Sequence, residues 1–217
     1  MAPKLYKMDA SPPARAAMMV CDVHNVPLEM VDVNLIEKEH LKPEYLKKNP
    51  LHTVPMFEDG DFILQDSHAI LIYLTEVYGK DDSLYPKETK QRAFVNQKLF
   101  FNNSILFTRL RNIAYPAIME GVRKPSEKQL NDIKEAYGFL EEFFSRTKYL
   151  ATNHITIADI AAFATVSSLI YIVSLDSKKY PRTHTWLKEM EKQSYSQKYN
   201  APGVTQIGGM LQNLLDL

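Results

Sequence analysis

The first part of the chain alternates short strand-like and helical runs of apolar residues. Glu29-Met-Val-Asp-Val-Asn34 alternates polar and apolar positions as a half-buried strand does, and Asp59-Gly60 between two apolar runs favours a hairpin turn. The expected elements in chain order are a strand at 4–8, a helix at 13–25, a strand at 29–34, a helix at 43–48, a hairpin within 51–64 and a helix at 66–79. A strand, a helix and a strand in succession predict a parallel pair with a right-handed crossover. The order over residues 1–80 is therefore β-α-β-α-β-β-α.

Residues 88–217 show helical patterns only, after a polar linker at 81–87 that contains a proline. The expected helices lie at about 88–120, 125–145, 156–174, 182–193 and 204–215. Pro116 falls inside the first of these helices, where it removes an interior hydrogen bond, so a kink is expected there. The pattern predicts an α+β domain followed by an all-α domain.

Composition narrows the classes of function. Lys+Arg and Asp+Glu both number 26, which argues against nucleic acid or an anionic membrane as the main partner. The single cysteine, Cys21, rules out an intramolecular disulfide and lies in an apolar helical pattern, so a core position is expected rather than a reactive one. No apolar run approaches the roughly 18 residues of a membrane span, and the N-terminus lacks the apolar region of a signal peptide. These features predict a cytoplasmic protein.

The junction between the first strand and the first helix is a candidate anion site. Ser11 precedes Pro12 and Pro13, which fit the first turn of a helix because missing N–H groups cost nothing there. The Ser11 side chain is therefore expected beside free backbone N–H groups and the positive end of the helix dipole. The alternative is an ordinary N-cap serine whose hydroxyl is used by the helix itself.

Four short motifs are spread over nearly the whole chain. They are Ser11-Pro12-Pro13-Ala14-Arg15, Asn49-Pro50-x-His52-Thr53-Val54-Pro55, Asp66-Ser67-His68-Ala69-Ile70 and Thr156-Ile157-Ala158-Asp159. Each is weak alone, but in this order and spacing they resemble the cytosolic glutathione transferases. The serine, the two histidines before Val-Pro and the Ser-His-Ala-Ile run resemble the insect delta and epsilon classes, with epsilon favoured.

The resemblance implies two domains. A thioredoxin-like, glutathione-binding domain would occupy 1–80, with a cis bond before Pro55, and an all-α electrophile-binding domain would occupy 88–217 after the linker at 81–87. It also implies glutathione as cosubstrate, no metal, and a homodimer that pairs the small domain of one subunit with the helical domain of the other.

Eight residues are implied by the resemblance to bind glutathione: His40, His52, Val54, Pro55, Asp66, Ser67, His68 and Arg111. The backbone of Val54 would pair with the peptide as an added strand does. Asp66 and Ser67 start a helix, whose free N–H groups hold a carboxylate. His40 and His52 would face the glycyl carboxylate, to which an imidazole donates one hydrogen bond.

Ser11 carries the catalytic role in this interpretation. A free thiol has a pKa near 8.5, so only a few per cent is thiolate at pH 7. A hydrogen bond from the Ser11 hydroxyl and the helix dipole both favour the thiolate; lowering the pKa by about two units requires roughly 2.7 kcal/mol. Ser11 is then a stabiliser of a sulfur anion and not a nucleophile, and no His-Asp pair at recognisable spacing supports a hydrolase triad.

The electrophile is expected against one face of the first long helix. The residues of this face are Phe107, Leu110, Arg111, Ala114 and Ile118, with Met119 beside them and Leu35 and Ile207 closing the pocket. The alternative is a buried helix stripe, as most apolar stripes are. Arg111 interrupts the stripe and requires either a buried partner or a cleft.

Three functions are consistent with these residues. The first is conjugation of glutathione to apolar electrophiles, in the detoxification of xenobiotics including insecticides. The second is a non-catalytic protein that binds hydrophobic ligands, and the third is a glutathione-dependent enzyme dedicated to an endogenous steroid-like substrate. The intact set of Ser11, His52, Val54-Pro55 and Asp66-Ser67 favours an enzyme over the binding protein.

Overall fold

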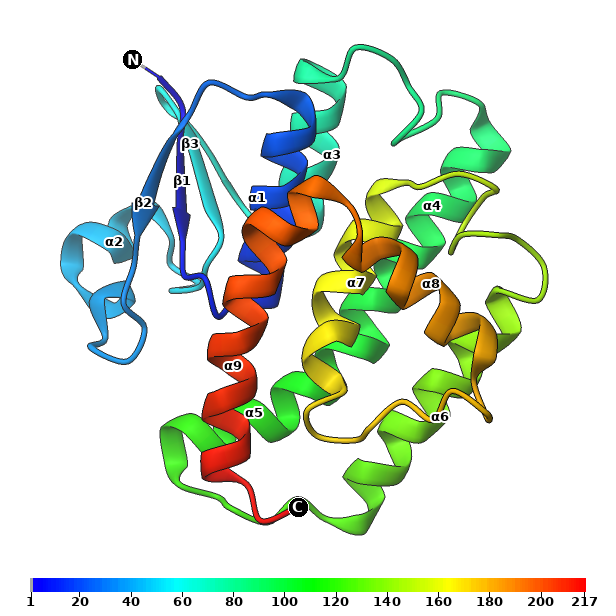
Figure 1. Cartoon of the computed structure of the whole chain (residues 1–217). Coiled ribbons are helices and arrows are strands. Elements are labelled where there is room, and N and C mark those ends of the chain that lie inside the picture. Colours follow the sequence, from blue (N-terminus) through cyan, green and yellow to red (C-terminus); the bar gives the residue numbers. More distant parts are fainter. Residues whose placement is uncertain (1) are drawn as a thin grey trace.

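The computed structural model describes residues 2–217 and places a four-stranded sheet beside a larger group of helices (Figure 1). The sheet has the order β2-β1-β3-β4, in which β1 pairs parallel to β2 and antiparallel to β3. Its elements are β1 Lys4–Lys7, α1 Pro12–His24, β2 Glu29–Asp32, α2 Pro43–Lys48, β3 Met56–Asp59, β4 Phe62–Gln65 and α3 Ser67–Tyr78. The predicted β-α-β-α-β-β-α order and the parallel first pair are confirmed.

The two faces of the sheet are covered by different helices, because successive side chains of a strand point to opposite sides. Leu5 is fully buried in the main core, which α1 and α3 share with the sheet. Its neighbour Tyr6 packs instead with a smaller cluster that includes Tyr45 of α2 and Val54. Because β1 and β3 are antiparallel, the β1–α1 turn and the loop before β3 lie at the same edge of the sheet, next to the helical part.

The rest of the chain is helical, as the pattern predicted. Its helices are α4 Thr89–Phe101, α5 Thr108–Glu120, α6 Glu127–Phe143, α7 Ile157–Leu169, α8 Pro181–Glu191 and α9 Ala201–Leu214. The expected single helix at 88–120 is interrupted by a π-helical stretch at Asn102–Phe107, whereas α5 continues through Pro116. None of the helices within 2–217 combines the length and the apolar character needed to cross a bilayer.

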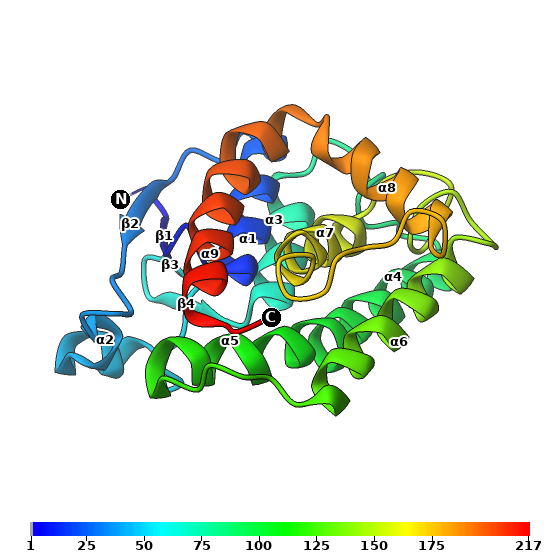
Figure 2. The ribbon, with the colours of Figure 1, turned by 60° about the horizontal axis from the view of Figure 1, so that its bottom comes forward.

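Helix α7 is the centre of the helical part, where Figure 2 shows it enclosed by its neighbours. Every residue of α7 is buried, and the helix contacts α1, α4, α8 and α9. Asp159 in its first turn accepts hydrogen bonds from the backbone N–H of Leu150 at 2.8 Å, from the Thr156 hydroxyl at 2.9 Å and from Trp186 Nε1 at 3.1 Å. Asp159 thus joins α7, α8 and the preceding loop, which is a structural role.

Arg15 of α1 connects two parts of the molecule: the part that contains the sheet with α1, α2 and α3, called the small domain below, and the helical domain formed by the rest of the chain. Its side chain is fully buried and donates to the backbone oxygens of Ala10 at 2.9 Å and Ala164 at 2.7 Å, and to Asn200 Oδ1 at 2.8 Å. No carboxylate lies within 4.0 Å of it in the described chain. A buried guanidinium therefore depends on neutral acceptors that come from both domains.

Lys98 of α4 is a second buried cation, and we expect its charge to lower stability. Only 7% of the residue is exposed, and its ammonium lies 3.1 Å from the centroid of the Phe143 ring. Burial, and secondarily Arg146, lowers the pKa of Lys98 to about 8. Between this value and the ordinary value of 10.5 the unfolded chain binds more protons than the folded protein, so this lysine makes stability rise with pH over that range.

Replacement Lys98→Met should therefore raise the free energy of unfolding at pH 7 by about 1 kcal/mol, less than the full pKa shift implies because the ammonium's contact with the Phe143 ring is lost with the charge. The gain over wild type should shrink by pH 9.5. Urea denaturation at both pH values and fixed protein concentration measures it, with the exposed Lys90→Met as the matched control. A gain that is the same at both pH values would show that Lys98 is not the titrating group.

Candidate functional site

A cavity of about 390 Å³ lies where the two parts of the chain meet. It is lined by the β1–α1 turn, the β2–α2 loop, the loop before β3, and helices α5 and α9. The lining residues are Met8, Ala10, Ser11, Pro12, Leu35, Ile36, Lys38, His40, Leu41, Leu51, His52, Thr53, Val54, Phe107, Leu110, Arg111, Ala114, Tyr115, Ile118, Met119, Ile207 and Met210. Polar groups come mainly from the small domain, whereas apolar groups come from both parts of the chain.

Ser11 is on the cavity wall and its hydroxyl is free. The residue is the N-cap of α1 in extended conformation, with φ −78° and ψ 116°, and Pro12 and Pro13 occupy the first helical positions. Its side chain makes no capping hydrogen bond, so the alternative of a hydroxyl used by the helix does not hold. Because the prolines leave the first turn without two of its N–H donors, the Ser11 hydroxyl is the group available to an anion at this point.

The bond between Val54 and Pro55 is cis, as predicted. The preceding carbonyl, that of Thr53, accepts hydrogen bonds from the Tyr45 hydroxyl at 2.6 Å and from Asn49 Nδ2 at 2.8 Å, which hold the turn in place. The backbone N–H and C=O of Val54 have no hydrogen-bond partner within the described chain. They offer one donor and one acceptor at the cavity wall, which is what an extended peptide requires.

His40 and His52 lie together at the polar end of the cavity, with ring centroids 6.1 Å apart. Burial, and secondarily the neighbouring His52, lowers the pKa of His40, so His40 is neutral at pH 7. Its Nδ1 is buried without a partner among residues 2–217. His52 and Lys38 both adopt positive φ, at 46° and 59°, a conformation uncommon for non-glycine residues that is found at functional sites.

The start of α3 is a separate polar group and does not line this cavity. Asp66 has φ 86° and caps the helix, because its Oδ1 accepts from the backbone N–H groups of His68 at 2.9 Å and Ala69 at 3.1 Å. The ring of His68 turns toward the helical domain, where its Nε2 lies 3.0 Å from Asn102 Nδ2. Burial lowers the pKa of His68, so it is neutral and accepts this hydrogen bond. Pro55 and Ser67 likewise lie outside the cavity wall.

Every residue predicted for the electrophile pocket lies on the cavity wall. The predicted stripe of α5 faces the cavity, and Leu35 and Ile207 close it from the β2–α2 loop and from α9. Tyr115 and Met210 were not predicted, although each follows a predicted residue at helical spacing, Arg111 and Ile207 respectively. The loop residues Lys38, Leu41 and Leu51 carry no periodic signal, so sequence pattern could not have placed them.

Comparisons with known proteins agree with this geometry. Residues 5–82 match a family described as "Glutathione S-transferase, N-terminal domain", and residues 79–194 match "Glutathione S-transferase, C-terminal domain". The chain is similar to Glutathione S-transferase 1 of Manduca sexta, at 44% identity over 92% of both chains. It is also similar to an epsilon-class glutathione S-transferase structure from the housefly, Musca domestica, with TM-score 0.95, 42% identity and 97% of each chain covered. A third relative is a glutathione transferase homolog from Drosophila mojavensis solved with bound glutathione, with TM-score 0.96, 40% identity and coverage of 99% of this chain and 98% of that chain.

Proposed function

Because this chain belongs to the insect delta/epsilon group of the glutathione S-transferase family, we propose that it joins the sulfur of glutathione to apolar electrophiles. One observation carries the proposal: the free Ser11 hydroxyl and the unpaired backbone of Val54 line the same cavity. The first group suits a sulfur anion and the second suits the peptide that carries it. A free hydroxyl at this point also favours catalysis over binding of hydrophobic ligands without turnover.

Glutathione would lie across the polar end of the cavity. Its cysteinyl residue pairs with the Val54 backbone, its glycyl carboxylate accepts from His52 and His40, and its γ-glutamyl carboxylate is held at the start of α3 by Ser67. We assign residues 1–80 to this glutathione-binding domain, 81–87 to the linker and 88–217 to the electrophile-binding domain. The Drosophila mojavensis homolog was solved with bound glutathione, which supports glutathione as the ligand of this chain.

The reaction follows from the position of Ser11. Its hydroxyl donates to the cysteinyl sulfur and stabilises the thiolate, which then attacks the electrophilic carbon. A lone pair of the thiolate sulfur forms the new C–S bond. The bond to the leaving group breaks, and its electron pair goes with the leaving group. Phe107, Ile118 and Met119 supply an apolar surface for the rest of the electrophile. Detoxification of xenobiotics, insecticides among them, is the setting that we propose.

His52→Asn tests where glutathione binds. Asparagine tolerates the positive φ of residue 52, but its side chain is shorter and places no donor where the outer imidazole nitrogen lies. We therefore expect the KM for glutathione to rise about tenfold while kcat changes less than twofold. Steady-state conjugation of 1-chloro-2,4-dinitrobenzene measures both constants. The exposed His154→Asn is the matched control. An unchanged KM would remove His52 from the glutathione site, and wild-type protein without any conjugation would refute the proposed function.

We also propose a cytoplasmic homodimer. Large apolar side chains are exposed on both parts of the chain: Phe62 and Val77 on the small domain, and Phe94 and Phe100 on α4, with Phe100 72% exposed. Apolar groups on both domains suit an isologous contact with a second copy, in which the small domain of one subunit meets α4 of the other. Sedimentation equilibrium should give twice the chain mass of 25.0 kDa, and a monomer at micromolar concentration would contradict the proposal.

A further inference from the structure

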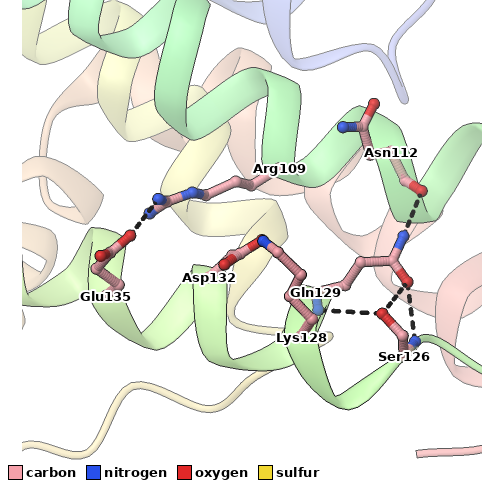
Figure 3. Close-up of polar contacts among 7 residues, drawn as sticks. All are labelled: Arg109, Asn112, Ser126, Lys128, Gln129, Asp132 and Glu135. Atoms are coloured by element: carbon pink, nitrogen blue, oxygen red, sulfur yellow. Dashed lines mark hydrogen bonds and ion pairs between the residues drawn. The ribbon is translucent and has the colours of Figure 1, made fainter.

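Arg109 and Arg111 lie two residues apart on α5, but within the described chain only Arg109 has an acidic partner. Arg109 forms an ion pair with Glu135 of α6, in which its Nη2 lies 2.5 Å from Glu135 Oε2 (Figure 3). Arg111 projects from another side of the helix onto the cavity wall. It has neither an ion pair nor a hydrogen bond within residues 2–217, while each of the other arginines in that range has at least one. Arg111 is therefore the arginine whose charge is left for a ligand.

The cavity concentrates this charge. Its ionisable lining residues are Lys38, His40, His52, Arg111 and Tyr115, and no carboxylate lies among the lining residues. The whole chain carries no formal net charge, so the imbalance is local to the cavity. A cleft lined by one sign of charge attracts ligands of the other sign.

The surroundings of Arg111 separate it from the groups assigned to glutathione. Phe107 at the end of the π-helical stretch lines the cavity near it, and so do three apolar residues of α5: Leu110, Ala114 and Ile118. The Tyr115 ring lies 4.9 Å from the guanidinium carbon and supports it along the wall. His40, His52 and Ser67, all in the small domain, already account for the two carboxylates of glutathione in the proposed function. The cation on α5 has no anion assigned to it there.

We propose that Arg111 binds an anionic group of the second substrate, so that the enzyme accepts apolar electrophiles that carry a carboxylate. This inference rests on the proposed function and specifies its substrate class. The apolar body of the electrophile lies against α5 and α9, and its carboxylate accepts the charge-assisted hydrogen bonds of the guanidinium. The carboxylate itself does not react, and Arg111 contributes recognition of the substrate.

A matched pair of probes isolates this contact. In 4-chloro-3-nitrobenzoate and its methyl ester, the glutathione thiolate attacks C4, the C–S bond forms, and chloride leaves with the electron pair of the C–Cl bond. The two probes differ in whether the group opposite the chlorine is charged. Because their intrinsic reactivities differ, each variant is compared with wild type for one probe at a time.

We expect Arg111→Gln to lower kcat/KM for the carboxylate about tenfold, corresponding to about 1.4 kcal/mol, and for the ester less than twofold. Arg111→Lys should retain most of the activity on the carboxylate, since it keeps the positive charge. The advantage of this variant over Arg111→Gln on the carboxylate should become smaller at high salt. Arg146→Gln, which removes an exposed arginine in the turn after α6, is the control and should leave kcat/KM for both probes unchanged. The KM for glutathione should stay within twofold in all variants.

Three results would overturn the inference. An equal loss of kcat/KM for both probes in Arg111→Gln would mean that Arg111 does not recognise the carboxylate. A raised KM for glutathione would place Arg111 in the glutathione site instead. A wild-type enzyme that conjugates the ester but rejects the carboxylate would also contradict it. Absence of conjugation with either probe and with 1-chloro-2,4-dinitrobenzene is a different result, because it refutes the proposed function itself.

Discussion

Ser11→Ala should lower kcat for glutathione conjugation at pH 7 by about 100-fold, the lower end of the loss that follows removal of one preorganised donor to a developing or bound anion. The reason is the position of the hydroxyl, which is free of the helix it precedes and lies on the cavity wall. Without it, the thiolate loses a charge-assisted hydrogen bond and a larger part of bound glutathione remains as thiol. Binding of the tripeptide depends on other groups, so the KM for glutathione should change less than threefold.

The pH dependence distinguishes this role from a structural one. If Ser11 stabilises the thiolate, the activity of Ser11→Ala should recover as pH rises toward the ordinary thiol pKa of about 8.5, because hydroxide then supplies the anion. Ser11→Thr should restore part of the activity, since it keeps a hydroxyl. Ser145→Ala, at an exposed position in the turn after α6, is the matched control. A loss in Ser11→Ala that is equal at pH 6.5 and pH 9 would show that Ser11 does not act on the ionisation of the thiol.

Arg15→Met should lower the free energy of unfolding by about 3 kcal/mol, the loss expected when one member of a buried polar network is removed. The methionine fills part of the volume but leaves several acceptors without a donor, namely the Ala10 and Ala164 carbonyls and Asn200 Oδ1. Burial lowers the pKa of Arg15 to about 9, so the guanidinium is still charged at pH 7 and makes these bonds with its full charge. The Arg15 side chain also packs tightly against Gly203, where an added Cβ would lie only 2.6 Å from Arg15 Cδ. Replacing this side chain therefore also disturbs close packing, which adds to the loss of stability.

Urea denaturation at fixed protein concentration measures the effect. The free energy of unfolding should fall less in Arg15→Lys than in Arg15→Met, because lysine keeps the positive charge and one of the hydrogen bonds. Arg182→Met is the control, because Arg182 forms an ion pair with Glu141 while its side chain remains 58% exposed, and such pairs contribute less than about 1 kcal/mol. If Arg15→Met and Arg182→Met were equally stable, Arg15 would not be the link between the two domains.

The fold could be predicted because its signals are local. Asp59-Gly60 specifies the β3–β4 hairpin, Pro12 and Pro13 specify the start of α1, and the apolar run after Thr156 specifies a buried α7. The π-helical stretch at Asn102–Phe107 could not be predicted, because its residues have the same apolar spacing as an α-helix and differ only in how the backbone hydrogen bonds are made.

The site was predicted in part, for the same physical reason. The stripe on α5 was found because helical spacing alone places Leu110, Ala114 and Ile118 on one face. The partner of a polar side chain depends on the fold as a whole. Arg15 contacts residues more than 140 positions away, such as Ala164, and His68 turns to Asn102, and no pattern within the sequence could indicate either pair.

Titration of the thiol of bound glutathione tests most directly whether Ser11 makes a thiolate in this cavity. Ultraviolet absorbance of the thiolate is recorded against pH for the saturated wild-type protein and for Ser11→Ala, with free glutathione as reference. We expect a pKa about two units below that of the free thiol in wild type, and a value within about half a unit of the free thiol in Ser11→Ala. A bound thiol that titrates at the same pH in both proteins, or that titrates as it does in water, would contradict the role assigned to Ser11.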